Sequence, residues 1–162
     1  MLIVFCGLPG SGKSYLASLL AAELKLDYLN TDILREKKSS EITYSHSNKF
    51  LVYENMLAFT IQLLSQGKDV IVDGTFYKKS LRDMFKNKAQ NIGHLTKFIY
   101  VFADEETIKQ RIVTKRKYSD ADFEVYQKIK KSFDYLKCNH LSIDTGTEYE
   151  SDSIKKIITF IH

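Results

Sequence analysis

Apolar residues along the chain form two kinds of pattern that alternate from the N-terminus to the C-terminus. Short, mostly apolar runs bounded by polar residues are typical of buried strands, and they lie at residues 2–6, 26–29, 69–73, 97–102 and 140–144. Between them, apolar residues recur every three or four positions, which predicts helices over about 13–25, 48–65, 78–90, 104–115, 119–137 and 151–161. Strands that alternate with helices indicate an α/β fold with a parallel sheet.

The alternation predicts a doubly wound, five-stranded parallel sheet with helices on both faces, joined by right-handed crossovers. The chain has 162 residues and contains no repeat, low-complexity tract or linker, so we expect a single domain over residues 1–162. In such a sheet, ligands bind beyond the carboxyl ends of the strands. The predicted strand ends carry polar or acidic residues: Thr31-Asp32, Asp73-Gly74-Thr75, Ala103-Asp104 and Asp144-Thr145, beside the loop that starts at Gly7.

The loop after the first strand, residues 7–14, reads Gly-Leu-Pro-Gly-Ser-Gly-Lys-Ser and fits the P-loop (Walker A) pattern. Glycines allow the backbone to approach a phosphate chain closely, and the following helix N-terminus favours anions. Lys13 can reach the β- and γ-phosphates and act in catalysis, and Ser14 can ligate Mg²⁺. We therefore expect ATP and Mg²⁺ to bind here, with ATP held by Gly7, Pro9, Gly10, Ser11, Gly12, Lys13, Ser14 and Tyr15.

Two acidic residues at strand ends are candidates for the chemistry. Asp73 closes the strand Val-Ile-Val-Asp, where an acid in P-loop proteins lies near Mg²⁺; the alternative is a turn or helix-capping aspartate. Asp32 and Arg35 are three residues apart and share a face of a helical turn. Asp32 can then accept the proton of a hydroxyl that attacks the γ-phosphate, while Arg35 holds an anionic group of the acceptor. Alternatively, Asp32 caps a helix that begins at Ile33, and Arg35 is solvated.

Basic residues cluster near the end of the fourth predicted helix, at Lys109, Arg111, Lys115, Arg116 and Lys117. We interpret this cluster as part of a lid, at about residues 115–122, that closes over ATP. Its arginines would bind the nucleotide, and Arg116 would also stabilise the transferred charge. Thr145, at the last strand end, is a further candidate nucleotide contact. A solvated basic helix face is the alternative.

The segment from about residue 32 to 57 is expected to lie on the acceptor side. Tyr44, His46, Lys49, Tyr53 and Asn55 mix aromatic, basic and amide groups, which suggests a wall that contacts the acceptor and stacks a base. From this group we select Tyr53 as an acceptor contact, together with Thr75 at the third strand end. A lone histidine such as His46 is more often structural, so we do not assign it a catalytic role.

The net charge and the cysteine content bear on the possible partners and the cellular compartment, but they do not identify the acceptor. The net charge is +4, which permits a phosphate-rich or nucleic-acid partner but does not require one. No apolar run approaches the ~20 residues of a membrane-spanning helix, and no signal-peptide pattern precedes the P-loop. Cys6 and Cys138 are far apart without metal-ligand spacing, so we expect reduced thiols in or near the core of a cytoplasmic protein.

These motifs together resemble the small P-loop kinases that include the 5′-hydroxyl polynucleotide kinase domains and, more distantly, gluconate and shikimate kinases. The resemblance spans nearly the whole chain, through residues 7–14, Thr31-Asp32-Ile33-Leu34-Arg35, and Val-Ile-Val-Asp-Gly-Thr-Phe at 70–76. Arg82 stands at about the family's position for a further arginine, and Arg111 to Arg116 with Ser119-Asp120-Ala121-Asp122 resembles the lid.

The resemblance implies transfer of the ATP γ-phosphoryl group to a hydroxyl. Asp32 then resembles the general base, Arg35 and Arg82 acceptor contacts, and Arg111 or Arg116 the lid arginine. Asp73 resembles the outer metal partner. The acceptor is open: it is the 5′-OH of a nucleic acid or nucleoside, or a small sugar or sugar acid. A nucleotide-dependent regulatory module, and a toxin-like kinase acting on a cell-wall sugar, are further alternatives.

Overall fold

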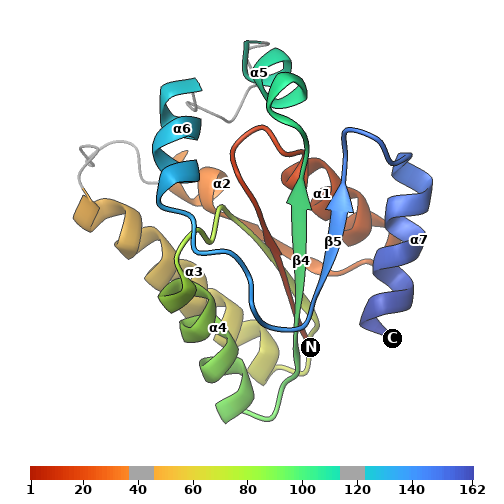
Figure 1. Cartoon of the computed structure of the whole chain (residues 1–162). Helices are drawn as coiled ribbons and strands as arrows, with labels where there is room; N and C mark the ends of the chain where they lie inside the picture. Colours follow the sequence, from red (N-terminus) through yellow and green to blue (C-terminus); the bar gives the residue numbers. More distant parts are fainter. Residues whose placement is uncertain (37–45, 114–122) are drawn as a thin grey trace.

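A computed structural model describes residues 1–36, 46–113 and 123–162 of the chain. Five parallel strands form one sheet in the order β2-β3-β1-β4-β5, which confirms the predicted architecture (Figure 1). The strands are β1 (Leu2–Cys6), β2 (Asp27–Asn30), β3 (Val70–Asp73), β4 (Thr96–Phe102) and β5 (His140–Asp144). The helices are α1 (Lys13–Leu24), α2 (Thr31–Glu36), α3 (His46–Ser65), α4 (Lys79–Asn91), α5 (Glu105–Val113), α6 (Phe123–Lys131) and α7 (Glu150–Ile161).

The central strand β1 is buried along its whole length because helices cover both faces of the sheet. Alternate β1 side chains therefore enter two different cores. Leu2 and Val4 pack with the α3 and α4 side of the sheet, whereas Ile3 and Phe5 pack with α1 and α7. Figure 1 shows these two helix pairs on opposite sides of the strands. This burial explains why β1 reads as an unbroken apolar run instead of an alternating one.

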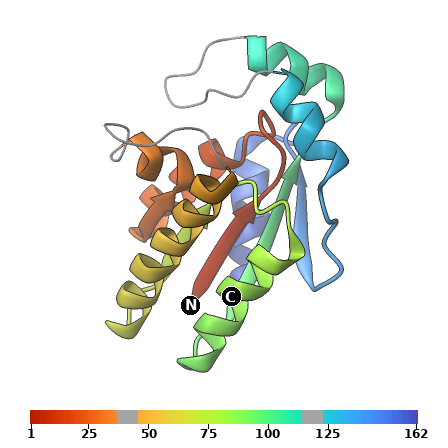
Figure 2. The ribbon, with the colours of Figure 1, turned by 90° about the vertical axis from the view of Figure 1, so that its left-hand side faces the viewer.

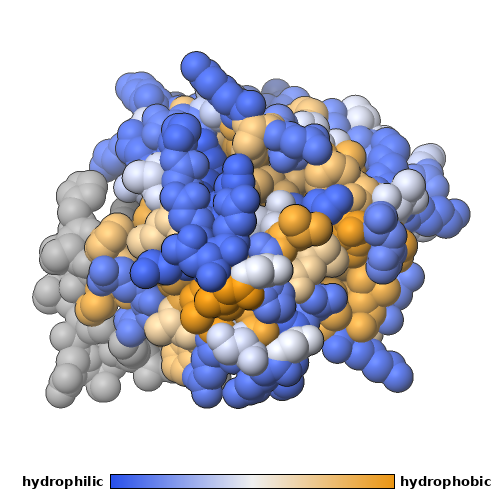
Figure 3. All heavy atoms as spheres, turned by 90° about the horizontal axis from the view of Figure 1, so that it is seen from below, coloured by the Kyte–Doolittle hydropathy of each residue, from blue (hydrophilic) through white to orange (hydrophobic). Residues whose placement is uncertain are grey.

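Helices α5 and α6 lie beyond the carboxyl ends of the strands, above the P-loop (Figure 2). A third apolar cluster connects them to the loop: Leu8 of the P-loop packs with Ile108 of α5, Tyr126 of α6 and Phe133. The opposite end of the molecule, at the amino ends of the strands, is mostly hydrophilic with scattered apolar patches (Figure 3). The sheet edge that carries the predicted site is therefore the one that the two helices overhang.

Two predicted element boundaries are wrong. The helix predicted over residues 119–137 ends at Lys131 in the structure, and its proposed start at 119–122 lies outside the described residues. The backbone N–H of Asp134 donates to Tyr77 O at 2.8 Å, and its carboxylate accepts the N–H of Lys79, the first residue of α4. These long-range bonds hold residues after α6 in a non-helical path. In addition, the short helix α2 begins at Thr31, immediately after β2, two residues before the start at Ile33 that was considered as an alternative.

The two cysteines lie in different environments. Cys6 is buried in β1 and its thiol donates to Ile99 O at 3.4 Å, but Cys138 is exposed, so its expected place in or near the core was wrong. Both thiols are unpaired. Burial raises the pKa of the Cys6 thiol to about 12, so it stays protonated and unreactive at neutral pH. Among the described helices, none combines the length and apolar character that crossing a membrane requires.

This difference predicts selective thiol labelling. In native protein at pH 7.5, we expect Ellman's reagent to react with Cys138 alone, and with both thiols after denaturation. The Cys138→Ser variant should show no rapidly reacting thiol in the native state. Rapid reaction of that variant would mean that β1 opens easily, contrary to its complete burial.

Candidate active site

The P-loop connects β1 to α1 and presents backbone N–H groups at the α1 N-terminus. Gly12 occupies the position before α1 with φ 86°, and Gly10 has φ 79°, both in the left-handed region that glycine adopts without a penalty. Because Gly12 has no side chain, it cannot cap the first N–H groups of α1. The chain therefore folds locally into a helix N-terminus suited to an anion, with Lys13 and Ser14 in its first turn.

Three polar side chains, Tyr28, Asn30 and Asp73, meet beside Ser14 at the adjoining ends of β2 and β3. Asn30 and Asp73 are paired neighbours in the two strands, and both are buried. The Asn30 Nδ2 atom lies 2.5 Å from Asp73 Oδ2, 3.0 Å from the Tyr28 hydroxyl and 3.5 Å from Ser14 Oγ. The Tyr28 hydroxyl itself donates to Asp73 Oδ2 at 2.9 Å. The predicted metal residues Ser14 of α1 and Asp73 of β3 therefore both lie within 3.5 Å of one amide nitrogen.

This cluster has oxygen atoms that suit Mg²⁺. Asp73 Oδ1 is buried and has no hydrogen-bond partner among the described residues, an arrangement that is unfavourable unless a cation or water is bound there. Mg²⁺ is usually held by one or two carboxylates together with water and substrate phosphates. The residues present thus fit the ion, with Asp73 and Ser14 as the groups that would hold it. Burial, and then the Asp73 charge, raise the pKa of Tyr28, so its hydroxyl stays protonated and can donate.

Asp32 lies in the first turn of α2, at the same edge of the sheet. Asn30 Oδ1 accepts the backbone N–H groups of Asp32 at 2.7 Å and Ile33 at 3.2 Å. Asn30, not Asp32, therefore caps this helix, which removes the main alternative role that we considered for Asp32. The half-buried Asp32 carries a charge that adds to the elevation of the Tyr28 pKa, after larger effects from burial and Asp73, so it lies near the polar cluster. Arg35 follows three residues later in α2.

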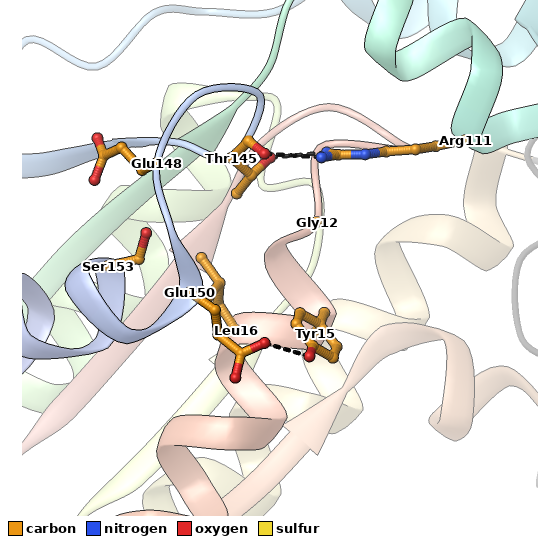
Figure 4. A pocket seen from close by; sticks show the side chains of 8 residues that line it. All are labelled: Gly12, Tyr15, Leu16, Arg111, Thr145, Glu148, Glu150 and Ser153. Carbon is orange, nitrogen blue, oxygen red and sulfur yellow. Dashed lines mark hydrogen bonds between the residues drawn. The ribbon is translucent and has the colours of Figure 1, made fainter.

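On the other side of the P-loop lies a pocket of about 200 Å³ between α1, α5 and the β5–α7 connection (Figure 4). Arg111 donates through its two terminal nitrogens to Thr145 Oγ1 and Thr145 O, each at 2.8 Å. Thr145 Oγ1 in turn donates to Ser11 O at 2.7 Å. Across the pocket, the Tyr15 hydroxyl donates to the Glu150 carboxylate. The pocket is lined by Gly12, Tyr15, Leu16, Arg111, Thr145, Glu148, Glu150 and Ser153.

The structure thus brings four predicted nucleotide residues, Gly12, Tyr15, Arg111 and Thr145, to one pocket. The planar guanidinium group of Arg111 is fixed by Thr145, and such a group can stack on a flat aromatic ring. Glu148, Glu150 and Ser153 also line this pocket, although the sequence pattern did not single them out. Glu148 lies in the connection after β5, and Glu150 and Ser153 lie in the first turns of α7, where no recognised motif marks a binding residue.

Three residues predicted to contact the acceptor, Tyr53, Thr75 and Arg82, form hydrogen bonds within the protein. Tyr53 is buried and its hydroxyl lies 3.1 Å from Thr75 Oγ1 and accepts the N–H of Phe76 at 3.1 Å. Arg82 is also buried and donates to the backbone oxygens of Phe76 and Asp134. Tyr53 and Arg82 thus bond the backbone of Phe76 and hold the loop that follows Asp73 at the end of β3. The sequence did not indicate this burial, because it depends on contacts distant in sequence, and direct contact of Tyr53 or Arg82 with an acceptor stays a prediction.

Other predicted residues have a different status. Arg116, Tyr44, Lys115, Lys117 and the lid segment lie outside the described residues. His46 and Lys49 lie in the first turn of α3, and the Asn55 amide donates to Leu51 O of its own helix. Sequence reasoning missed Tyr28 and Asn30. Asn30 carried a usable signal, because asparagine at a strand-to-helix junction is a preferred helix cap.

Comparisons with known proteins identify the family and the fold of this chain. A family model described as an AAA domain matches residues 2–136. The adenylate kinase of Elusimicrobium minutum (strain Pei191) is 27% identical over 174 residues, which cover 100% of this chain and 81% of the relative. A Sinorhizobium meliloti 1021 gluconokinase structure has a TM-score of 0.72 at 18% identity, covering 98% of this chain and 90% of that chain.

A further solved structure is the Mycobacterium tuberculosis APS kinase in complex with AMPPNP and APS. It has a TM-score of 0.76 at 15% identity and covers 99% of this chain and 96% of that chain. At such identities the two solved structures establish the fold, whereas the family match extends over most of the chain. The chain therefore belongs to the AAA domain family, and its architecture is that of a P-loop kinase.

Proposed function

We propose that this P-loop kinase transfers the γ-phosphoryl group of ATP to a hydroxyl group of its acceptor, with Mg²⁺ as cofactor. The observation that carries the proposal is the placement of Asp32. Its helix begins directly at the end of β2, and the capping residue of that helix also contacts Asp73 and Ser14. A candidate base, a candidate metal carboxylate and the P-loop therefore share one edge of the sheet.

In this proposal, Lys13 and the P-loop N–H groups bind the phosphate chain, and Asp32 receives the acceptor's hydroxyl proton. The acceptor oxygen forms a bond to the γ-phosphorus as the bond from that phosphorus to the bridging oxygen of ADP breaks. Bound Mg²⁺ supplies neutralisation of phosphate charge, with Ser14 and Asp73 as its protein partners. Arg35 would hold an anionic group of the acceptor, and Arg116 would approach the phosphates from the lid.

We propose the 5′-OH of a nucleic acid or nucleoside as the first acceptor class, and a small sugar or sugar acid as the second. The motif Thr31-Asp32-Ile33-Leu34-Arg35 and the net charge of +4 favour a hydroxyl next to a phosphate. The fold shared with a gluconokinase favours the second class. The unpaired thiols suit a reducing compartment, so we place the protein in the cytoplasm.

The test of acceptor class is transfer of labelled γ-phosphate from ATP with Mg²⁺ to a panel of hydroxyl compounds. The panel contains 5′-OH DNA and RNA oligonucleotides, nucleosides, gluconate and shikimate, with 5′-phosphorylated oligonucleotides as matched controls. We expect label on the 5′-OH oligonucleotides and none on their phosphorylated counterparts. Affinity for them should fall steeply with salt, because phosphate contacts release counterions. Label only on gluconate or shikimate would instead establish the second class, and no label on any compound would contradict both proposed acceptor classes.

The pocket beside Arg111 predicts a role for Thr145 in nucleotide binding. Thr145→Val keeps the shape of the side chain but removes the hydroxyl that bonds both Arg111 and Ser11 O. We expect ATP to bind about tenfold more weakly, since hydrogen bonds to a charged group contribute roughly 1.5–3 kcal/mol and Arg111 keeps its bond to the Thr145 carbonyl. Calorimetric titration with ATP checks this. Thr147→Val, an exposed neighbour in the same loop, is the control and should bind ATP normally.

A further inference from the structure

Beyond the roles predicted from motifs, the hydrogen bonds of Asn30 connect two parts of the candidate site. Its side-chain oxygen accepts the N–H groups of Asp32 and Ile33, and its side-chain nitrogen faces Asp73, Tyr28 and Ser14. The partners fix the orientation of the amide, because backbone N–H groups only donate and a carboxylate oxygen accepts. The buried side chain of Asn30 thus forms hydrogen bonds both to the helix that carries Asp32 and to the Asp73 carboxylate, which is expected near Mg²⁺.

The Tyr28 hydroxyl completes a closed triangle with Asn30 Nδ2 and Asp73 Oδ2, whose three distances lie between 2.5 and 3.0 Å. Asp73 Oδ2 consequently accepts two hydrogen bonds from β2. Its other oxygen, Oδ1, is buried and has no partner among the described residues. The carboxylate is therefore held through one oxygen while the other stays available to a cation or to a water bound to it.

The number of hydrogens on the Asn30 amide also limits its bond to Ser14. An amide NH₂ group has two hydrogens, and Asn30 has two acceptors, Asp73 and Tyr28, that are nearer than Ser14 Oγ at 3.5 Å. Ser14 is the weakest of the three partners, so its hydroxyl can turn towards a metal without breaking the triangle. Asn30 therefore holds Asp73 through Oδ2 and leaves Asp73 Oδ1 and the Ser14 hydroxyl available to a metal.

We propose that Asn30 and Tyr28 are positioning residues that orient Asp73 for Mg²⁺, and that Asn30 also fixes the helix of Asp32 relative to that ion. The inference rests on the proposed function, and it assigns roles to two residues that the sequence motifs did not single out. Groups that orient a metal ligand in this way typically change metal affinity 10–100-fold when removed.

Two variants separate metal positioning from helix capping. Asn30→Ser keeps a side-chain oxygen that can cap α2 but removes the amide nitrogen that contacts Asp73. Tyr28→Phe keeps the ring and removes only the hydroxyl donated to Asp73. The matched control is Tyr100→Phe, because Tyr100 is a half-buried phenol of β4 that lies outside the triangle. Far-UV circular dichroism verifies that each variant is folded.

The measurement is the affinity of the non-hydrolysable probe AMPPNP by calorimetry, in EDTA and over a series of Mg²⁺ concentrations up to saturation. The quantity of interest is the Mg²⁺ concentration that produces half of the gain in affinity, which does not depend on catalysis. We expect both variants to keep the EDTA affinity of the wild type and to need about tenfold more Mg²⁺ for half of the gain, with Tyr100→Phe unchanged. If Asn30→Ser does not fold, Tyr28→Phe alone decides.

An unchanged Mg²⁺ requirement in folded Tyr28→Phe and Asn30→Ser would overturn the inference. An affinity of the wild-type protein for AMPPNP that is the same with and without Mg²⁺ would also overturn it. A reduced EDTA affinity with an unchanged Mg²⁺ requirement would also overturn it, because that pattern indicates a structural role for the triangle. These failures are distinct from failure of the proposed function, which the transfer assay on the wild-type protein tests separately. Label transfer with an unaffected Mg²⁺ requirement would leave the kinase proposal standing and remove only the roles of Asn30 and Tyr28.

Discussion

Replacing Asp32 with asparagine should lower phosphoryl transfer by about 10²- to 10⁴-fold, the usual range for loss of a general base. Asparagine has nearly the same shape, but its amide cannot take up the acceptor's proton at neutral pH. The backbone N–H of residue 32 still bonds Asn30 Oδ1, so the cap of α2 survives. ATP affinity should stay close to that of the wild type, because the P-loop is unaltered.

The measurement is the initial rate of label transfer at saturating ATP, alongside calorimetric ATP affinity. Asp27→Asn is the matched control, because Asp27 lies at the amino end of β2, the strand that leads into α2, and pairs with Lys68 at 3.3 Å. That control should transfer phosphate at the wild-type rate. Wild-type transfer by Asp32→Asn would remove Asp32 as the base, and a large loss of ATP affinity would assign it to nucleotide binding.

The parts of this site that the sequence could predict are those whose geometry is local. The P-loop is encoded in eight consecutive residues, because the glycines, the lysine and the helix start act on one short stretch of backbone. The location of the residues at the strand ends can also be predicted, because the carboxyl ends of parallel strands lie at one edge of the sheet. The apolar runs that precede Asp32 and Asp73 are therefore enough to place both acids at that edge.

What the sequence could not supply is the set of contacts between distant segments. The pairing of Asn30 with Asp73 depends on the β2–β3 register, and 43 residues separate the two. The hydrogen bonds of the Arg82 guanidinium group to the backbone oxygens of Phe76 and Asp134 could not be predicted either. Asp134 likewise ended a helix that its local sequence would continue. In each case a tertiary hydrogen bond decided the outcome, and no periodic pattern records such a bond.

The second large effect concerns the stability of the P-loop itself. Gly7 follows β1 with φ 153°, and its N–H bonds Thr75 O at 3.3 Å. A Cβ atom at this position would lie 2.1 Å from Val101 O of β4 and 3.1 Å from Ser11 Oγ. The nearest atom belongs to the backbone of a buried strand, so it cannot rotate away. Gly7→Ala must therefore push the P-loop away from β4.

We expect Gly7→Ala to reduce the free energy of unfolding by about 3–5 kcal/mol, from overpacking together with an unfavourable φ. For a chain of this size the loss corresponds to a lowering of Tm by roughly 10 °C or more. The measurements are urea unfolding and thermal denaturation, and ATP affinity is determined under conditions where the variant is still folded. That affinity should also fall, because the displaced loop no longer presents its N–H groups in the same arrangement.

Gly67→Ala separates steric conflict from backbone strain in this prediction. Gly67 has φ 78°, but a Cβ atom there meets nothing within 4 Å. That variant should lose only the roughly 1–2 kcal/mol typical of a left-handed residue that is not glycine, and it should bind ATP normally. Equal losses for the two variants would mean that the close approach of Gly7 to Val101 relaxes at little cost. A loss confined to Gly7→Ala, with weaker ATP binding, would show that the packing of β1 against β4 holds the phosphate loop in its binding shape.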